Sequence, residues 1–267
     1  MLVKRVVTAL LLVALLALVL FLLPPALAIV ALGLLTLAGA WEWAAFAGLT
    51  SHAGRAGYAA ACAVVMSVLW AVAATPAGFE AVMSAALAWW LLAFAWLVFA
   101  PGSGRPALAG AAGIAALAPM WVAIAHLYAS GPRGLEFTIF VLLLAWAADM
   151  GAYFAGRRFG RSKLAPRVSP NKTWEGVLGG LLASAAVAWV GHVWFGLPSL
   201  AFLPLCVATV LASIVGDLTE SMFKRQVGLK DSGRILPGHG GILDRIDSLT
   251  AAVPVFVLGL AWLGVLP

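Results

Sequence analysis

The residues best suited to chemistry lie in one polar interval, residues 221–247, the longest in an otherwise apolar chain. The interval contains three carboxylates, five lysine or arginine side chains, one histidine and five glycines. Carboxylates bind Mg²⁺, cations neutralise phosphate charge, and glycines let a backbone approach a phosphate closely. The interval therefore predicts a site for a metal-bound polyphosphate. Its candidate site residues are Ser221, Lys224, Arg225, Lys230, Asp231, His239, Gly240, Gly241, Asp244, Arg245 and Asp247.

Helical spacing groups several of these side chains. The spacing i, i+3, i+4 and i+7 would place four side chains on one face of a helix: Asp217, Glu220, Ser221 and Lys224. Asp244 and Asp247 are three residues apart and would share a helical face in the same way. The pair Asp244 and Asp247 suits Mg²⁺, a cation that takes oxygen ligands.

A further carboxylate, Asp149, lies in an apolar segment eight residues before Arg157, and Asp217 lies seven residues before Lys224. A helix rises 1.5 Å per residue, so both carboxylates would lie about 10–12 Å below their basic loops. Carboxylates are costly in lipid and usually face the interior of a helix bundle. We therefore expect Asp149 and Asp217 to share one polar cavity, although a structural ion pair or a proton path would use the same placement.

A possible anion site lies just before a later apolar segment. Ser169 suits the N-cap of a helix, and Pro170 suits its first turn. Free backbone donors at such a start, together with Lys172, would bind an anion. The pattern has low specificity, because many capped helices share it. The arginines and lysines of residues 157–163 are explained mostly by membrane topology or by attraction to anionic head groups.

The composition indicates an integral membrane protein. The chain has 267 residues, 64% hydrophobic and 10% charged, against roughly 25% charged in an average soluble domain. Cys62 and Cys206 lie in apolar runs, so we expect neither a disulfide nor a metal thiolate. The predicted fold is all-α and polytopic, with about nine transmembrane helices. The expected spans are 6–23, 26–46, 58–74, 81–99, 108–128, 137–156, 177–195, 200–223 and 248–266.

The first span is a largely apolar run of 18 residues, whereas the apolar core of a secretory signal has about 7–15, so we expect it to be retained. With nine spans, 15 of the 16 lysines and arginines fall on one side, and Arg133 alone lies on the other. Positive charge marks the cytoplasmic side. We expect the N-terminus and both basic loops in the cytoplasm, in the inner membrane of a bacterium, with the C-terminus outside.

The chain divides into two predicted regions. Residues 1–136, about five helices, contain little polar chemistry beyond Glu42, His52 and His126 and resemble a scaffold for packing and oligomerisation, which would allow a homodimer. Lone polar groups near helix ends usually reach the interface or cap a helix. Residues 137–267, about four helices with two basic loops, would form the catalytic region.

The polar residues resemble the signature of the phosphatidate cytidylyltransferases, also called CDP-diacylglycerol synthases. The likeness covers roughly residues 149–250. It includes Ser221, Lys224-Arg225, Lys230-Asp231, Pro237, His239-Gly240-Gly241, Asp244-Arg245 and Asp247 in the long interval, and Asp149, Ala152-Tyr153, Gly156-Arg157, Ser169-Pro170 and Lys172-Thr173-Trp174-Glu175-Gly176 before it.

The resemblance implies a membrane enzyme that acts on CTP and phosphatidate and does not bind nucleic acid. It would form CDP-diacylglycerol and pyrophosphate and would use Mg²⁺, as one or two metal ions. Under it, Asp217 and Asp244 are the main metal ligands, and Asp247 and Asp149 support them. The expected phosphate-binding and catalytic cations are Lys172, Lys224, Arg225 and Arg245. Further substrate contacts are expected from Tyr153, Ser169, Thr173, Ser221, Lys230, Asp231, Gly240 and Gly241.

Two other classes of function fit part of the pattern. A CTP-dependent lipid kinase would also need a metal and basic loops, but it would release CDP rather than pyrophosphate. An ion-coupled transporter would explain Asp149, Asp217 and Glu220, yet it would not need the glycine-rich loop, and the sequence shows no inverted repeat. His239 can donate a proton to a leaving group or can equally be a loop histidine bonded to a carbonyl.

Overall fold

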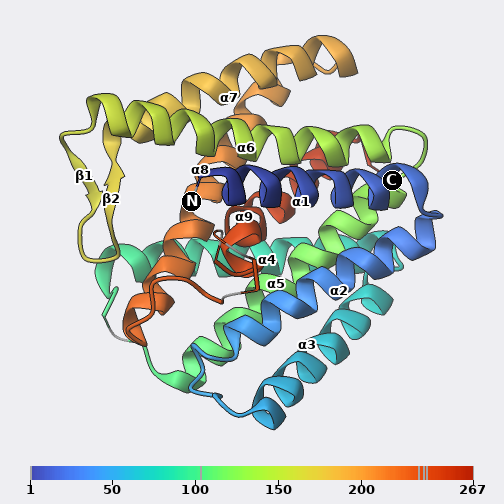
Figure 1. Ribbon diagram of the computed structural model, residues 1–267. Coiled ribbons are helices and arrows are strands. Elements are labelled where there is room, and N and C mark those ends of the chain that lie inside the picture. Colours follow the sequence, from blue (N-terminus) through green and yellow to red (C-terminus); the bar gives the residue numbers. More distant parts are fainter. Residues whose placement is uncertain (1, 103, 234, 237, 239, 267) are drawn as a thin grey trace.

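The computed structural model describes residues 2–102, 104–233, 235, 236, 238 and 240–266, with side chains described from residue 7 onward. Within these residues the chain forms nine helices and one two-stranded hairpin (Figure 1). The elements are α1 (Leu2–Leu22), α2 (Pro25–Trp43), α3 (His52–Val72), α4 (Pro76–Phe99), α5 (Pro106–Ala129), α6 (Gly134–Phe159), β1 (Lys163–Ala165), β2 (Ser169–Thr173), α7 (Trp174–Phe195), α8 (Ser199–Gln226) and α9 (Leu243–Trp262).

Eight helices, α2 to α9, are long and apolar enough to cross a membrane, and the described side chains of α1 form a shorter apolar segment, Val7–Leu22. The predicted all-α polytopic fold is therefore confirmed. The starts of α2, α4 and α5 follow from local chemistry. Pro25, Pro76 and Pro106 stand at the first helical position of these helices, where no backbone N–H is needed.

The predicted helix start at Ser169 and Pro170 is wrong. Those residues begin β2, which pairs antiparallel with β1, so that Ala165 opposes Ser169 and Lys163 opposes Thr173. The N-cap of α7 is Thr173, whose Oγ1 accepts a hydrogen bond of 3.1 Å from the Gly176 backbone N–H. Pairing with β1 satisfies backbone hydrogen-bonding groups of the segment that the sequence predicted to begin a helix. Lys172 consequently lies near the end of a strand.

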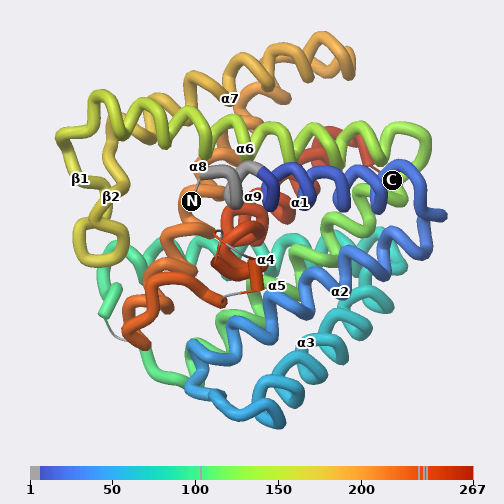
Figure 2. Tube along the Cα trace, in the orientation of Figure 1, coloured from blue at the N-terminus to red at the C-terminus, as the bar shows by residue number. Residues whose placement is uncertain are grey.

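Helix α9 occupies the centre of the bundle and packs against α2, α4, α5, α6 and α8. Figure 2 shows its trace enclosed by these elements, with α7 on the outer side of α6. α9 begins at Leu243, five residues before the predicted span start at Ser248. Asp244 and Asp247 therefore lie on its first turns, in the helical spacing that the sequence predicted.

Helices α6 and α7 approach closely because small residues face each other between them. A Cβ built on Gly179 of α7 would lie 2.2 Å from Ala155 Cβ and 2.7 Å from the Gly151 carbonyl oxygen of α6. Small residues let helix backbones approach in a membrane. This contact fixes α6 beside the hairpin and α7, which together carry several site residues.

Gly179→Ala is expected to lower the melting temperature in detergent by several degrees, because overpacking costs about 1–3 kcal/mol. Gly57→Ala is the matched control, since a Cβ on Gly57 of α3 would meet nothing within 4 Å. Thermal unfolding of both variants measures the difference. Equal melting temperatures would contradict the close α6–α7 contact.

Candidate active site

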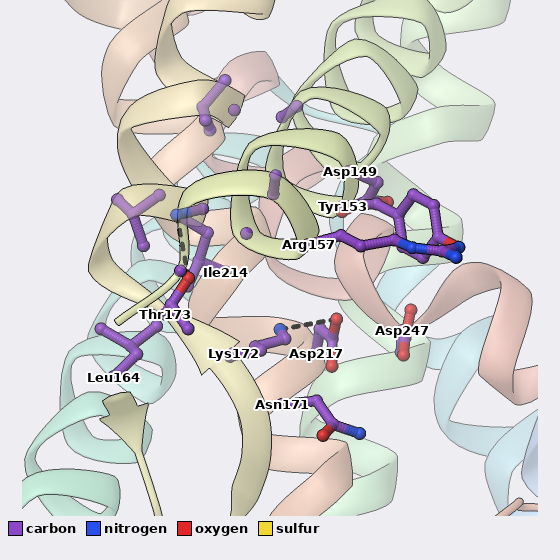
Figure 3. A pocket seen from close by; sticks show the side chains of 18 of the residues that line it. Asp149, Tyr153, Arg157, Leu164, Asn171, Lys172, Thr173, Ile214, Asp217 and Asp247 are labelled. Atoms are coloured by element: carbon purple, nitrogen blue, oxygen red, sulfur yellow. Dashed lines mark hydrogen bonds and ion pairs between the residues drawn. The ribbon is translucent and has the colours of Figure 1, made fainter. Parts of the chain in front are cut away.

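One cavity of about 770 Å³ lies between α6, the hairpin, α7, α8 and α9 (Figure 3). Its volume falls within the range of ordinary ligand sites, about 300–1,000 Å³. One part of the lining is charged and another part is apolar. The charged lining residues are Asp149, Arg157, Lys163, Lys172, Asp217, Lys224, Asp231, Asp244, Arg245 and Asp247, and the larger apolar ones are Leu164, Val177, Val210 and Ile214.

Asp149 of α6 and Asp217 of α8 line this same cavity, as their predicted depth required. Figure 3 labels both carboxylates and shows Asp217 beside Lys172, with Asp149 next to Tyr153. The charge of Asp217 acts on Asp149 and on Asp247, and Asp149 also accepts a hydrogen bond of 3.4 Å from Ser248 Oγ. The fold thus gathers acidic groups from three helices.

Lys172 forms an ion pair with Asp217, with 2.6 Å between Nζ and Oδ2. Each side chain is 26% exposed, so water reaches the pair and its contribution to stability is modest. Ser221 Oγ donates a hydrogen bond of 3.3 Å to the other Asp217 oxygen. A partly hydrated lysine beside an acidic group can exchange that partner for a phosphate.

Lys224 lies deeper, between two acids. Its Nζ is 2.7 Å from Glu220 Oε2 and 2.8 Å from Asp244 Oδ1, and all three side chains are less than 10% exposed. Asp244 also accepts hydrogen bonds from the backbone N–H groups of Ser232 and Gly241. Removing one partner of such a buried network is costly, because it leaves a charge uncompensated.

The donor chemistry fits Mg²⁺, which takes oxygen ligands and binds through one or two carboxylates plus substrate phosphates. Asp217, Asp149 and Asp247 line the cavity and interact through their charges. Among the described residues, however, no group of three or more acidic, histidine or cysteine side chains is arranged to hold an ion by itself. Both oxygens of Asp244 accept hydrogen bonds, and both oxygens of Asp217 are engaged by Lys172 and Ser221. Either carboxylate would therefore have to exchange a partner to bind a metal ion, and the predicted ligand roles stay predictions.

The predicted site residues divide by position. Besides the aspartates named above, the cavity lining includes five of the predicted site residues: Tyr153, Lys172, Thr173, Asp231 and Arg245. Thr173 acts as the α7 cap, and Tyr153 Oη accepts a hydrogen bond of 2.8 Å from Arg157. Gly240 and Gly241 lie in the loop against Asp244 rather than in the lining, and His239 lies outside the described residues.

Arg225 faces elsewhere. It lines a second cavity of about 390 Å³ beside Phe99, Arg167 and Met222, and its guanidinium donates a hydrogen bond of 2.9 Å to the Leu229 carbonyl. Two further predicted residues, Ser169 on β2 and the exposed Lys230, are not in the described lining of the main cavity. Their predicted substrate contacts stay predictions.

Sequence reasoning missed two groups. Arg157, Lys163 and Asn171 line the cavity, but the sequence pattern assigns no substrate contact to any of them, even though Arg157 belongs to the family signature. Glu42 of α2 is 2% exposed and contacts the loop before α9. The available signal for Glu42 was a single acid in an apolar span, which is costly to bury and often functional.

Comparison with known proteins agrees with this architecture. The model of the cytidylyltransferase family matches residues 3–263, and the chain belongs to that family. A phosphatidate cytidylyltransferase from Pseudomonas aeruginosa is 47% identical over 98% of this chain and 97% of its own length. Another of that name, from Haemophilus influenzae, is 40% identical over 96% of this chain and 97% of its own. The family resemblance expected from residues 149–250 is confirmed.

Proposed function

We propose that the chain transfers the cytidylyl group of CTP to phosphatidate and forms CDP-diacylglycerol and pyrophosphate. The observation that carries this proposal is the main cavity, where lysines and carboxylates meet between membrane-spanning helices. Its charged part suits two phosphorylated head groups. Its apolar part, including Val177, Val210 and Ile214, suits acyl chains that remain among the helices.

The reaction needs charge neutralisation more than a strong base. A phosphate oxygen of phosphatidate attacks the α-phosphorus of CTP, and the bond from that phosphorus to the oxygen bridging the β-phosphate breaks. Pyrophosphate leaves with the electron pair. The nucleophile is already an anion, so the enzyme must hold two repelling phosphates in line. Lys172, Lys224 and Arg245 line the cavity and supply positive charge.

Mg²⁺ would be held by one or two carboxylates, with Asp217 and Asp244 as the main candidates and Asp149 and Asp247 in support, together with the substrate phosphates. It would neutralise charge on the nucleotide phosphates as a Lewis acid. Participation of a second metal ion stays a prediction. When the nucleotide arrives, the chain's own contribution is to free Lys172 from Asp217 and to orient phosphate oxygens against Lys224 and Arg245.

The proposed setting is the cytoplasmic face of a bacterial inner membrane, within phospholipid synthesis. The uneven distribution of lysine and arginine supports this orientation, and the two relatives named above come from bacteria. A homodimer and the division into a scaffold and a catalytic region remain predictions.

Lys172→Ala is expected to raise the KM for CTP at least about tenfold and to change the KM for phosphatidate much less, because its charge faces the nucleotide phosphates. Arg161→Ala is the control, since Arg161 is exposed and lies outside the described cavity lining. Initial rates over both substrates measure the two constants. An effect confined to phosphatidate would mean that the two subsites are exchanged.

The test of the function uses purified protein in mixed micelles with phosphatidate, Mg²⁺ and CTP labelled separately at the α- and γ-phosphates. We expect the α-label in the lipid and the γ-label in pyrophosphate. Transfer of the γ-label to lipid, with release of CDP, would instead identify a lipid kinase.

A further inference from the structure

Glu42, near the end of α2, connects the N-terminal helices to the polar interval. Its Oε2 accepts a hydrogen bond of 3.0 Å from Ser232 Oγ and one of 2.8 Å from the Leu243 backbone N–H. These partners are 190 and 201 residues away in the sequence. The side chain is buried, so both bonds are shielded from water.

The contact with Leu243 serves the start of α9. The first backbone N–H groups of a helix have no partner within the helix and need an outside acceptor. Ile242, the N-cap residue of α9, has no side-chain oxygen to offer, and no side-chain cap is formed there. Glu42 supplies an acceptor from another helix, and its negative charge is favourable at the positive end of α9.

The loop backbone lies directly against this carboxylate. A Cβ built on Gly233 would lie 2.1 Å from Glu42 Oε1, and one built on Gly241 would lie 2.3 Å from Oε2. Real side chains do not approach so closely, so both positions need glycine with this arrangement of Glu42. Packing against Glu42 therefore explains why positions 233 and 241 are glycines.

The same loop residues also hold Asp244 from the other side. Backbone N–H groups of Ser232 and Gly241 donate to Asp244 Oδ2 over 3.0 and 2.7 Å. Asp244 in turn accepts a hydrogen bond of 2.8 Å from Lys224 Nζ. Contacts thus run from Glu42 through the loop to Asp244 and to a cavity-lining lysine.

We infer that Glu42 is a positioning residue for cytidylyl transfer: it fixes the loop before α9 and the first turn of α9, and so places Asp244 and Lys224. The inference rests on the proposed function. Glu42 is not in the described lining of the main cavity, so it acts through these contacts and not on substrate. A region assigned by sequence to a scaffold would thereby help to build the site.

The experiment compares full-length Glu42→Ala and Glu42→Gln with the wild type in micelles. Glutamine keeps an oxygen that can accept both hydrogen bonds, whereas alanine removes it. Thr36→Val is the matched control, because Thr36 is also buried in α2 but donates only to the Leu32 carbonyl of its own helix. Two readouts are taken: kcat and both KM values, and hydrogen exchange of peptides covering 231–245.

For Glu42→Ala we expect kcat to fall at least about thirtyfold, with each KM changed less than about threefold. Exchange should rise about tenfold or more in 231–245 and stay unchanged in α5 and α6. Glu42→Gln should keep kcat within about fivefold of wild type, and Thr36→Val should match wild type in both readouts.

Normal turnover of Glu42→Ala would overturn the inference, and so would an equal rise of exchange along the whole chain, which indicates general destabilisation. If Glu42→Ala does not fold, Ser232→Ala removes one of the same bonds, and unchanged kcat and exchange in that variant would overturn it. A wild type that makes no lipid product would refute the proposed function itself. An active wild type with a fully active alanine variant would refute only the positioning role.

Discussion

Asp217→Asn should lower turnover at least about a hundredfold, because it removes a charged ligand from the site where phosphate charge must be neutralised. Asp217 pairs with Lys172 at 2.6 Å and interacts with Asp149 and Asp247. Asparagine has nearly the same shape, so the loss would report charge and coordination rather than packing. Initial rates at saturating Mg²⁺ measure it.

The control for this substitution is Ser213→Ala in the same helix. Ser213 is buried and donates only to the Val210 carbonyl, 2.7 Å away. We expect this variant to keep turnover close to that of wild type. Turnover of Asp217→Asn within a few-fold of Ser213→Ala would contradict the assignment of Asp217.

Lys224→Met should reduce both stability and turnover. Lys224 is held between Glu220 and Asp244 at 2.7 and 2.8 Å, and breaking a buried ion network by removing one partner costs about 3–5 kcal/mol. Turnover should fall at least about a hundredfold, because Lys224 also lines the cavity and would stabilise phosphate charge. Thermal unfolding and initial rates measure the two effects.

A second substitution separates the effect of Lys224→Met on stability from its effect on turnover. Adding Glu220→Gln to Lys224→Met removes one uncompensated charge, so the melting temperature should recover partly while turnover stays low. If the double variant recovers turnover together with stability, Lys224 has a structural role only.

The sequence predicted the features that depend on local pattern. Apolar length identified the spans, and helical spacing placed Asp244 and Asp247 on one face at the start of α9. The equal depth of Asp149 and Asp217 below basic loops predicted their common cavity. These properties follow from helix geometry and from the cost of burying charge in lipid.

Two features of the site depend on contacts between segments that the sequence pattern does not reveal. Ser169 and Pro170 looked like a helix start, but pairing with β1 makes them part of a strand. Arg225 follows Lys224 directly, yet the helix turns its guanidinium toward a second cavity. Adjacent residues on a helix face different directions, so membership of a motif did not establish a place in the site.

Glu42 shows a third limit. Its partners lie 190 or more residues away, so no spacing rule connects them. An isolated acid in an apolar span carries only the general expectation of a buried partner. The fold was needed to show that this partner is the loop that holds Asp244.

The most direct measurement is protection of a cysteine in the cavity by CTP. Asn171 is exposed and lies in the lining beside Lys172 (Figure 3). Asn171→Cys can therefore be labelled with a charged thiol reagent after the buried Cys62 and Cys206 are replaced by alanine. Ser162→Cys, exposed but outside the described lining, is the control.

If the cavity binds the nucleotide, CTP with Mg²⁺ should slow labelling of Cys at position 171 at least about tenfold at saturation and leave position 162 unaffected. Labelling at position 171 should also abolish lipid product. The contradictory result is a variant that still turns over CTP while saturating CTP leaves labelling at position 171 unchanged.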